Sequence, residues 1–95
     1  MTRKIEKKAQ NNIKKILREF ITENFLLSAG LDTFEEDDSF MEKGIIDSTG
    51  VLELLEFIEE RFNIRVEDEE VIPDNLDSLN KLTSFIERKS GYAGK

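Results

Sequence analysis

The chain has 95 residues, a net charge of −7, no cysteine and no histidine. This length suits one small domain with a core but without a deep cleft. The two missing residue types exclude disulfides, thiolate catalysis, a Ser–His triad and most transition-metal sites, so we expect neither an enzyme nor a metal site. The longest apolar run, Phe25-Leu26-Leu27, is too short for a signal peptide or a membrane span, so a cytoplasmic protein is expected.

The charge is unevenly distributed along the chain. Residues 1–18 contain seven Lys or Arg and one Glu, a balance of +6, and residues 19–80 contain nineteen acids and three bases, a balance of −16. Residues 81–95 contain four bases and one acid, which is +3. The acidic middle predicts attraction to basic protein surfaces and argues against nucleic acid as a partner.

The first segment has the period of an amphipathic helix, with basic residues on its other face. Such a helix can bind membranes or nucleic acid, but we interpret its stripe as core because so short a chain needs every apolar face. The apolar positions are Ile5, Ala9, Ile13, Ile16 and Phe20, with Leu17 and Ile21 widening the stripe.

The helical period is lost between residues 23 and 47. Phe25-Leu26-Leu27 either prolongs the helix or forms a separate turn, and Ala29-Gly30 has the composition of a helix stop. Phe40 and Met41 are expected to anchor the rest as a long loop. Its acids do not fit the spacing of an EF-hand, so no calcium site is predicted.

A second helix is predicted over residues 48–62. Asp47 is a suitable N-cap, and Gly50 in the first turn is a poor helix former whose missing side chain should leave room for a partner or prosthetic group beside Ser48. The predicted apolar stripe consists of Val51, Leu54, Leu55, Ile58 and Phe62. The outer face carries Glu53, Glu56, Glu59 and Glu60.

The remainder predicts an extended link, one helical turn and a last helix. Residues 64–66 should turn alternate side chains inward, and residues 68–71 should form a turn that Pro73 ends. Asp77 is expected to cap the last helix, which reaches about Lys89. Its stripe consists of Leu79, Leu82, Phe85 and Ile86.

The predicted fold is therefore all-α: a small four-helix bundle of three main helices and one short helix. We expect a single domain over residues 1–95, ordered from about 4 to 90, with a flexible tail at 91–95. The residues predicted to be buried where the stripes meet are Ile16, Phe20, Leu54, Ile58, Phe62, Leu82 and Ile86.

Ser48 is the candidate functional residue. Directly after the cap, its hydroxyl should face solvent at the positive end of the helix dipole, where a phosphate would be favoured. A chain without histidine has no ready general base for this serine and, without cysteine, no thiol. Ser48 therefore suits attachment of a group rather than catalysis.

At this point the sequence resembles the acyl carrier proteins, over roughly residues 4–90. The most specific match is Gly44-Ile45-Ile46-Asp47-Ser48, which is similar to the Asp-Ser-Leu attachment motif of that family. Asp38-Ser39-Phe40 and Glu59-Glu60-Arg61-Phe62-Asn63-Ile64 also match, as do the acidic turn and the final short helix in their order. The departures are Thr49 in place of Leu and Gly50 in place of an acid.

The resemblance implies that Ser48 carries 4′-phosphopantetheine, transferred from coenzyme A by a phosphopantetheinyl transferase, with Asp47 as the cap beside the site. The arm would hold acyl or aminoacyl groups as thioesters for partner enzymes of fatty-acid, specialised lipid or polyketide biosynthesis. Glu53, Glu59 and Glu60 map to the family's docking positions, and Glu56 shares their face. Stand-alone carriers that serve acyl or aminoacyl ligases are the most similar type, and the chain is expected to be a monomer. The alternative is an interaction module of the same fold that is never modified.

Overall fold

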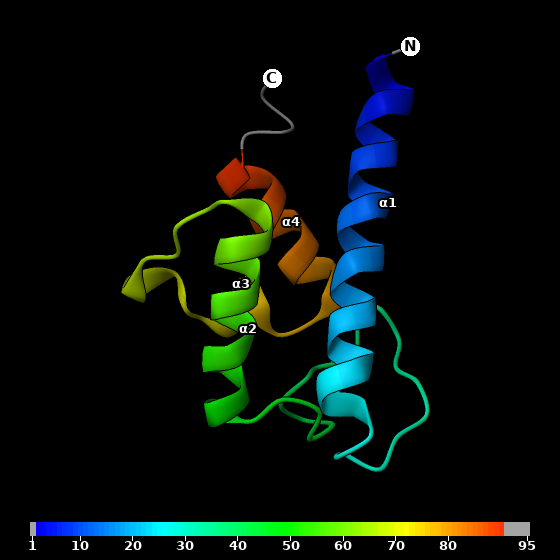
Figure 1. Ribbon diagram of the computed structural model, residues 1–95, viewed down its shortest axis with the longest axis vertical. Helices are drawn as coiled ribbons and strands as arrows, with labels where there is room; N and C mark the ends of the chain where they lie inside the picture. The colour runs from blue at the N-terminus through cyan, green and yellow to red at the C-terminus, as the bar shows by residue number, and fades with distance from the viewer. Residues whose placement is uncertain (1, 91–95) are drawn as a thin grey trace.

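The computed structural model describes residues 2–90, with side chains from residue 12 onward. The described chain contains α1 (Thr2–Ile21), α2 (Ser48–Phe62), α3 (Pro73–Leu76) and α4 (Leu79–Ser90), and no strand. In Figure 1, α4 crosses between the upright α1 and α2, and the long loop closes the lower end. The predicted all-α bundle is thereby confirmed. The predicted tail at 91–95 and the side chains of Ile5 and Ala9 lie outside what is described.

The core lies where α1, α2 and α4 face one another. The predicted stripe of α4 is buried throughout, as are Leu54 and Ile58 of α2. On α1 the deepest line is Ile13, Leu17 and Ile21.

Three residues predicted to be buried, Ile16, Phe20 and Phe62, are only half-buried. Ile16 and Phe20 each precede a residue of the deep line on α1. They are therefore rotated by about 100° toward the flank of the helix.

The chain continues beyond α1 into a π-helical turn, Thr22–Leu26. Phe25 and Leu26 are both buried, whereas Leu27 is 86% exposed. The helical run stops at Gly30, whose φ of +75° lies in the left-handed region, and the Leu31 N–H returns to the Leu26 carbonyl at 3.2 Å. The expected stop is confirmed, and the Phe-Leu-Leu run prolongs the helical path.

The loop before α2 is anchored to the junction of α3 and α4. The Ser39 hydroxyl and the Met41 N–H both donate to the Asp77 carboxylate, and the Phe40 N–H donates to the Asp77 carbonyl. Phe40 is buried, but Met41 is 60% exposed, so the prediction that both side chains anchor the loop is wrong for Met41. Met41 is held through its backbone instead.

The expected cap of α4 is also corrected. The Asp77 carboxylate is occupied by the loop, and the next residue caps the helix: Ser78 Oγ accepts the Lys81 N–H at 3.1 Å. Both residue types are good caps, and the contact with Ser39, 38 positions away, determines which of the two performs this role.

The segment after α2 has the predicted link and turn, and a short helix that was not expected follows them. α2 ends at Asn63 in the left-handed conformation (φ 55°), and the link has Ile64 and Val66 half-buried around an exposed Arg65. A 3-10 turn covers Asp68–Glu70. The short helix α3 differs from the prediction, in which Pro73 only ends the preceding turn. Proline also suits the first position of a helix, which it occupies here.

None of the helices described between residues 2 and 90 combines the length and the hydropathy needed to cross a bilayer.

Candidate functional site

Ser48 is the exposed first residue of α2, as predicted. Asp47 precedes it in an extended conformation, and its Oδ1 accepts the Gly50 N–H at 2.7 Å. The Asp47 carbonyl accepts the Val51 N–H at 3.0 Å. Asp47 is therefore the N-cap, and it fixes the first turn on which the serine hydroxyl is presented.

Gly50 is buried, which corrects the expectation that its missing side chain leaves room for a partner. A Cβ built on Gly50 would lie 2.9 Å from Cε1 of Phe25, 3.1 Å from Cγ2 of Ile46 and 3.3 Å from Oδ1 of Asp47. The space beside the Gly50 backbone is thus filled by the chain itself. The glycine admits the edge of the Phe25 ring.

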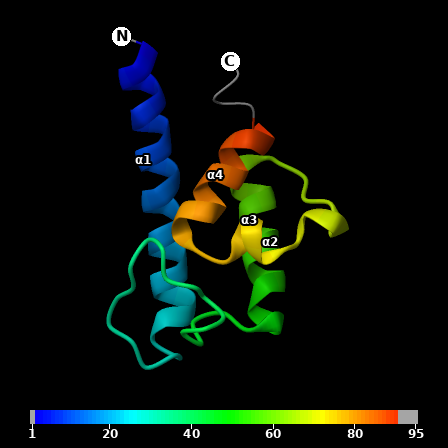
Figure 2. The same cartoon turned by 180° about the vertical axis from the view of Figure 1, so that it is seen from behind.

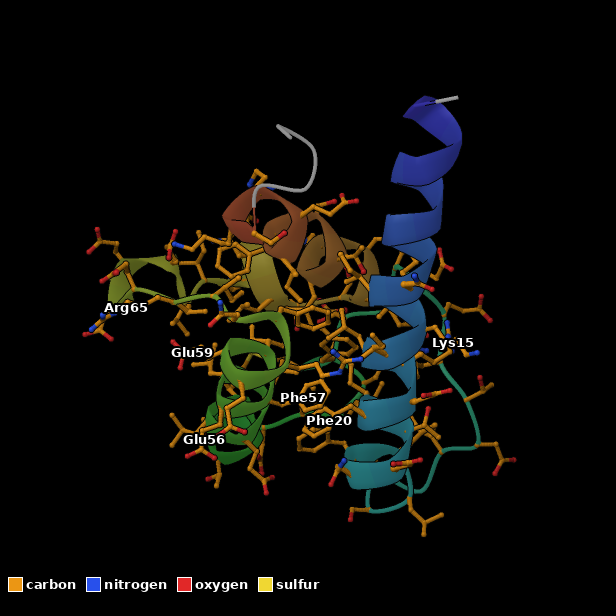
Figure 3. All side chains as sticks on the ribbon, turned by 45° about the horizontal axis from the view of Figure 1, so that its top comes forward. Lys15, Phe20, Glu56, Phe57, Glu59 and Arg65 are labelled. Carbon is orange, nitrogen blue, oxygen red and sulfur yellow. The ribbon has the colours of Figure 1, made fainter. Side chains whose placement is uncertain are left out.

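A line of three aromatic rings connects that contact to the interface of α1 and α2. Phe25 meets Phe20 edge to face with centroids 5.8 Å apart, and Phe20 stacks on Phe57 with centroids 3.9 Å apart and ring planes 8° apart. Figure 3 shows Phe20 and Phe57 pointing toward each other from the two helices. The rings join α1, the π-helical turn and the start of α2.

An apolar pocket of about 110 Å³ lies between the loop, α2 and α3. Two of its lining residues, Ile46 and Val51, flank Ser48 in the sequence. The other lining residues are Phe40, Met41, Leu54, Val71, Ile72, Pro73, Leu76 and Asp77. The pocket can accept a small apolar group but offers an ammonium or carboxylate few partners.

The predicted acidic face is present on α2, with one member in a different role. Glu53, Glu56 and Glu60 are exposed. Glu59 is half-buried, and its Oε2 accepts the Val66 N–H at 2.9 Å, so this carboxylate also holds the link after α2. In Figure 3, Glu56 and Glu59 project from α2 on the side away from Phe57 and α1.

The site thus consists of the exposed Ser48 hydroxyl at the capped start of α2 and a small apolar pocket beside it. The acidic face lies further along the same helix. Asp47, the carboxylate next to Ser48 in sequence, is already engaged by the Gly50 N–H. This geometry leaves the Ser48 hydroxyl accessible to another protein at the first turn of α2.

No family model matches the chain. The chain is 34% identical over 76 residues to a D-alanyl carrier protein of Leuconostoc mesenteroides subsp. mesenteroides, and the alignment covers 79% of this chain and 97% of that relative. The chain belongs to the carrier protein family. The four-helix fold agrees with this membership. The predicted resemblance to carrier proteins is confirmed at the level of the carrier family.

In this carrier protein, the sequence predicts the places of Asp47 and Ser48 at the start of α2, but it misses two contacts that shape their surroundings. The first is Phe25 on Gly50, and the second is Glu59 on the Val66 N–H. The available signal for the first contact is Gly50 itself, because a glycine near the start of a helix indicates that another group approaches the backbone closely. The approaching ring is 25 residues away, and no local pattern identifies it.

Proposed function

We propose that this carrier protein bears 4′-phosphopantetheine on Ser48 and uses it to carry an aminoacyl group as a thioester. The observation that carries the proposal is the exposed hydroxyl of Ser48 on the capped first turn of α2. The similarity to a D-alanyl carrier protein supports the same role.

The residues around Ser48 fit such a group. The phosphate of a phosphodiester is favoured at the N-terminus of α2, where first-turn N–H groups and the helix dipole present positive charge. The half-buried Val51 and the pocket behind it offer apolar surface along the path from the serine. When bound, the arm would supply the terminal thiol that this cysteine-free chain lacks.

The chain's own residues hold and present the serine. Asp47 fixes the first turn by accepting the Gly50 N–H, and no histidine is available anywhere in the chain to remove the Ser48 proton. A transferase must therefore bring the base as well as coenzyme A. The loading and unloading enzymes are likewise separate proteins, and the carrier is not itself a catalyst.

A small cargo is the better match to this site. The pocket of about 110 Å³ is smaller than the apolar cavity of ~150 Å³ that takes up one benzene, so it cannot hold a long acyl chain as it stands. The relative's name specifies D-alanine, which is small. We therefore place an aminoacyl group ahead of a fatty acyl group. Because the pocket offers an ammonium few partners, the charged end of this cargo would stay in solvent.

The attachment is tested by incubating the apo protein with coenzyme A and a broad-specificity phosphopantetheinyl transferase, followed by intact mass and peptide mapping. We expect one phosphopantetheine-sized gain on the peptide that contains Ser48. Ser48→Ala should abolish the gain, and Thr49→Val, which removes the neighbouring hydroxyl, should retain it. The absence of a gain in the parent would favour the alternative of an unmodified interaction module.

The cargo is read from protein purified from its own cells. A thioester-bound aminoacyl group adds its own mass to that of the protein with its arm. Mild hydroxylamine cleaves the thioester and removes this added mass, and the arm stays attached. A hydroxylamine-labile increment of fatty-acyl size would overturn the choice of an aminoacyl cargo while leaving the attachment at Ser48 intact.

A further inference from the structure

The contact between Phe25 and Gly50 joins a rare backbone feature to the turn that carries Ser48. π-Helical turns occur mostly as single insertions and are frequent at functional sites. The turn Thr22–Leu26 delivers Phe25 to the start of α2, where the ring edge would lie 2.9 Å from a Cβ on Gly50. The π-helical turn and the start of α2 lie at the same end of the molecule in Figures 1 and 2.

Glycine at this position weakens the first turn of α2 when taken alone, because glycine is a poor helix former. The ring compensates by covering the turn: Phe25 is 7% exposed and Gly50 is buried beneath it. The Asp47 carboxylate holds the same residue from the other side through the Gly50 N–H. Gly50 is thus fixed by a ring on one side and a cap on the other, two positions after Ser48.

We infer that Phe25 is a positioning residue for the modification of Ser48. Seated on Gly50, its ring holds the first turn of α2 so that the serine hydroxyl stays in the geometry that the transferase needs. The inference rests on the proposed attachment at Ser48. Phe20 and Phe57 support the ring from behind, through the edge-to-face contact of Phe20 with Phe25 and the stack of Phe20 on Phe57.

The sign of one substitution separates this role from simple helix propensity. Gly50→Ala should help an ordinary helix, since alanine is the better helix former. Here the added methyl meets the buried ring, so we expect Gly50→Ala to slow phosphopantetheine transfer. Phe25→Leu should slow it as well by releasing the turn. The double variant should be faster than Gly50→Ala alone, because the tightest of the three contacts around the new methyl, the one with Phe25, is then relieved.

The experiment measures kcat and KM separately for phosphopantetheine transfer from coenzyme A, at a temperature where circular dichroism shows every variant folded. A displacement of about 1 Å at a reacting group can cost up to 100-fold, so we expect kcat to fall roughly ten-fold in each single variant while KM stays near that of the parent. The matched control is Phe85→Leu, which removes a ring that is 2% exposed from α4 without touching α2's first turn. It should lower the melting temperature and leave kcat unchanged.

The outcomes are distinct from those that test the proposed function. A parent that gains no phosphopantetheine refutes the attachment itself. A parent that is modified, with Phe25→Leu and Gly50→Ala at the parental kcat, refutes only the role of Phe25. A double variant no faster than Gly50→Ala alone also refutes it. Should Phe25→Leu fail to fold, Phe25→Met replaces it in both the single and the double variant, because the flexible, unbranched methionine side chain fills irregular gaps in a core.

Discussion

Short polar side chains set the boundaries of this fold, and long-range contacts assign their roles. Asp47 caps α2 because its carboxylate is free to accept the Gly50 N–H. Asp77, of the same type and also just before a helix, accepts from Ser39 and Met41 of the loop instead. Ser78 then caps α4. The residue types predict that a helix begins nearby, and only the tertiary contact decides which residue begins it.

Glu70 is a residue whose ionisation the fold alters. Its Oε1 accepts the Glu67 N–H and the Lys89 ammonium, both at 2.9 Å, and these two hydrogen bonds lower the pKa of the Glu70 carboxyl below 4.5. The contacts tie the 3-10 turn to α4. That turn leads directly into the pocket wall formed by Val71 and Ile72.

The lowered pKa makes a prediction about stability against pH. Because the folded pKa of Glu70 is depressed, its ionised form favours folding; this contribution is complete above about pH 4.5 and is lost as the pH falls through the lowered pKa. Glu70→Gln should therefore unfold at lower urea than the parent at pH 7, and the difference should shrink below pH 4.5. Glu69→Gln, the exposed neighbour, serves as control. A difference independent of pH would show that the carboxylate charge is not what stabilises the turn.

At the scale of elements, the stability of the bundle depends on the buried line of α2. Leu54→Ala removes a side chain that is 1% exposed, and buried Leu→Ala changes typically cost about 2–5 kcal/mol. Leu52→Ala is the matched control, because it makes the same change on the same helix at 64% exposure and should stay within about 0.5 kcal/mol. Urea unfolding followed by circular dichroism measures both. Equal midpoints for the two variants would contradict the assignment of Leu54 to the buried face and Leu52 to the exposed face.

Periodicity and end signals predicted the long elements of this fold well. α2 begins at Ser48 and ends at Phe62 as the cap and stripe indicate, and the whole stripe of α4 is buried. The features that the sequence does not predict depend on contacts between distant residues, or on residues that have two structural roles. Pro73 both ends one turn and begins α3, and Gly50 is a close-approach glycine for a ring in another segment. The local sequence pattern predicts neither of these two roles.

At the scale of the whole molecule, the first turns of α1 and the start of α2 lie far from each other (Figures 1 and 2). Figures 1 and 2 show the first turns of α1 at one end of the molecule and the start of α2 near the other. Ser48 is the first residue of α2. The basic residues cluster within 1–18, whereas Glu53, Glu56 and Glu60 are exposed on the helix that Ser48 begins. A partner that docks on this face of α2 already has the serine within its footprint. A partner that docks on the first turns of α1 does not.

We therefore expect the acidic face of α2, and not the basic N-terminus, to recruit the transferase. The test variant is Glu53/Glu56/Glu60→Lys; Glu59 is spared because its carboxylate holds the Val66 N–H. Exposed pairs contribute about 0–1 kcal/mol each, so three reversals together should lower kcat/KM roughly ten-fold or more at low salt, mainly through the association rate. The loss should shrink at high salt, because screening weakens exposed charges.

Two controls make this measurement decisive. Glu19/Glu35/Glu69→Lys changes the net charge equally at exposed positions outside α2, and a variant lacking residues 1–10 removes much of the basic segment. Both should be modified at close to the parental rate once circular dichroism confirms that they are folded. An equal loss in the first control would make recognition a matter of net charge, since the attraction would not depend on where the acids lie. A slow truncation beside an unaffected α2 variant would move the docking surface to α1, and Ser48 would then have to be reached from the far end of the molecule.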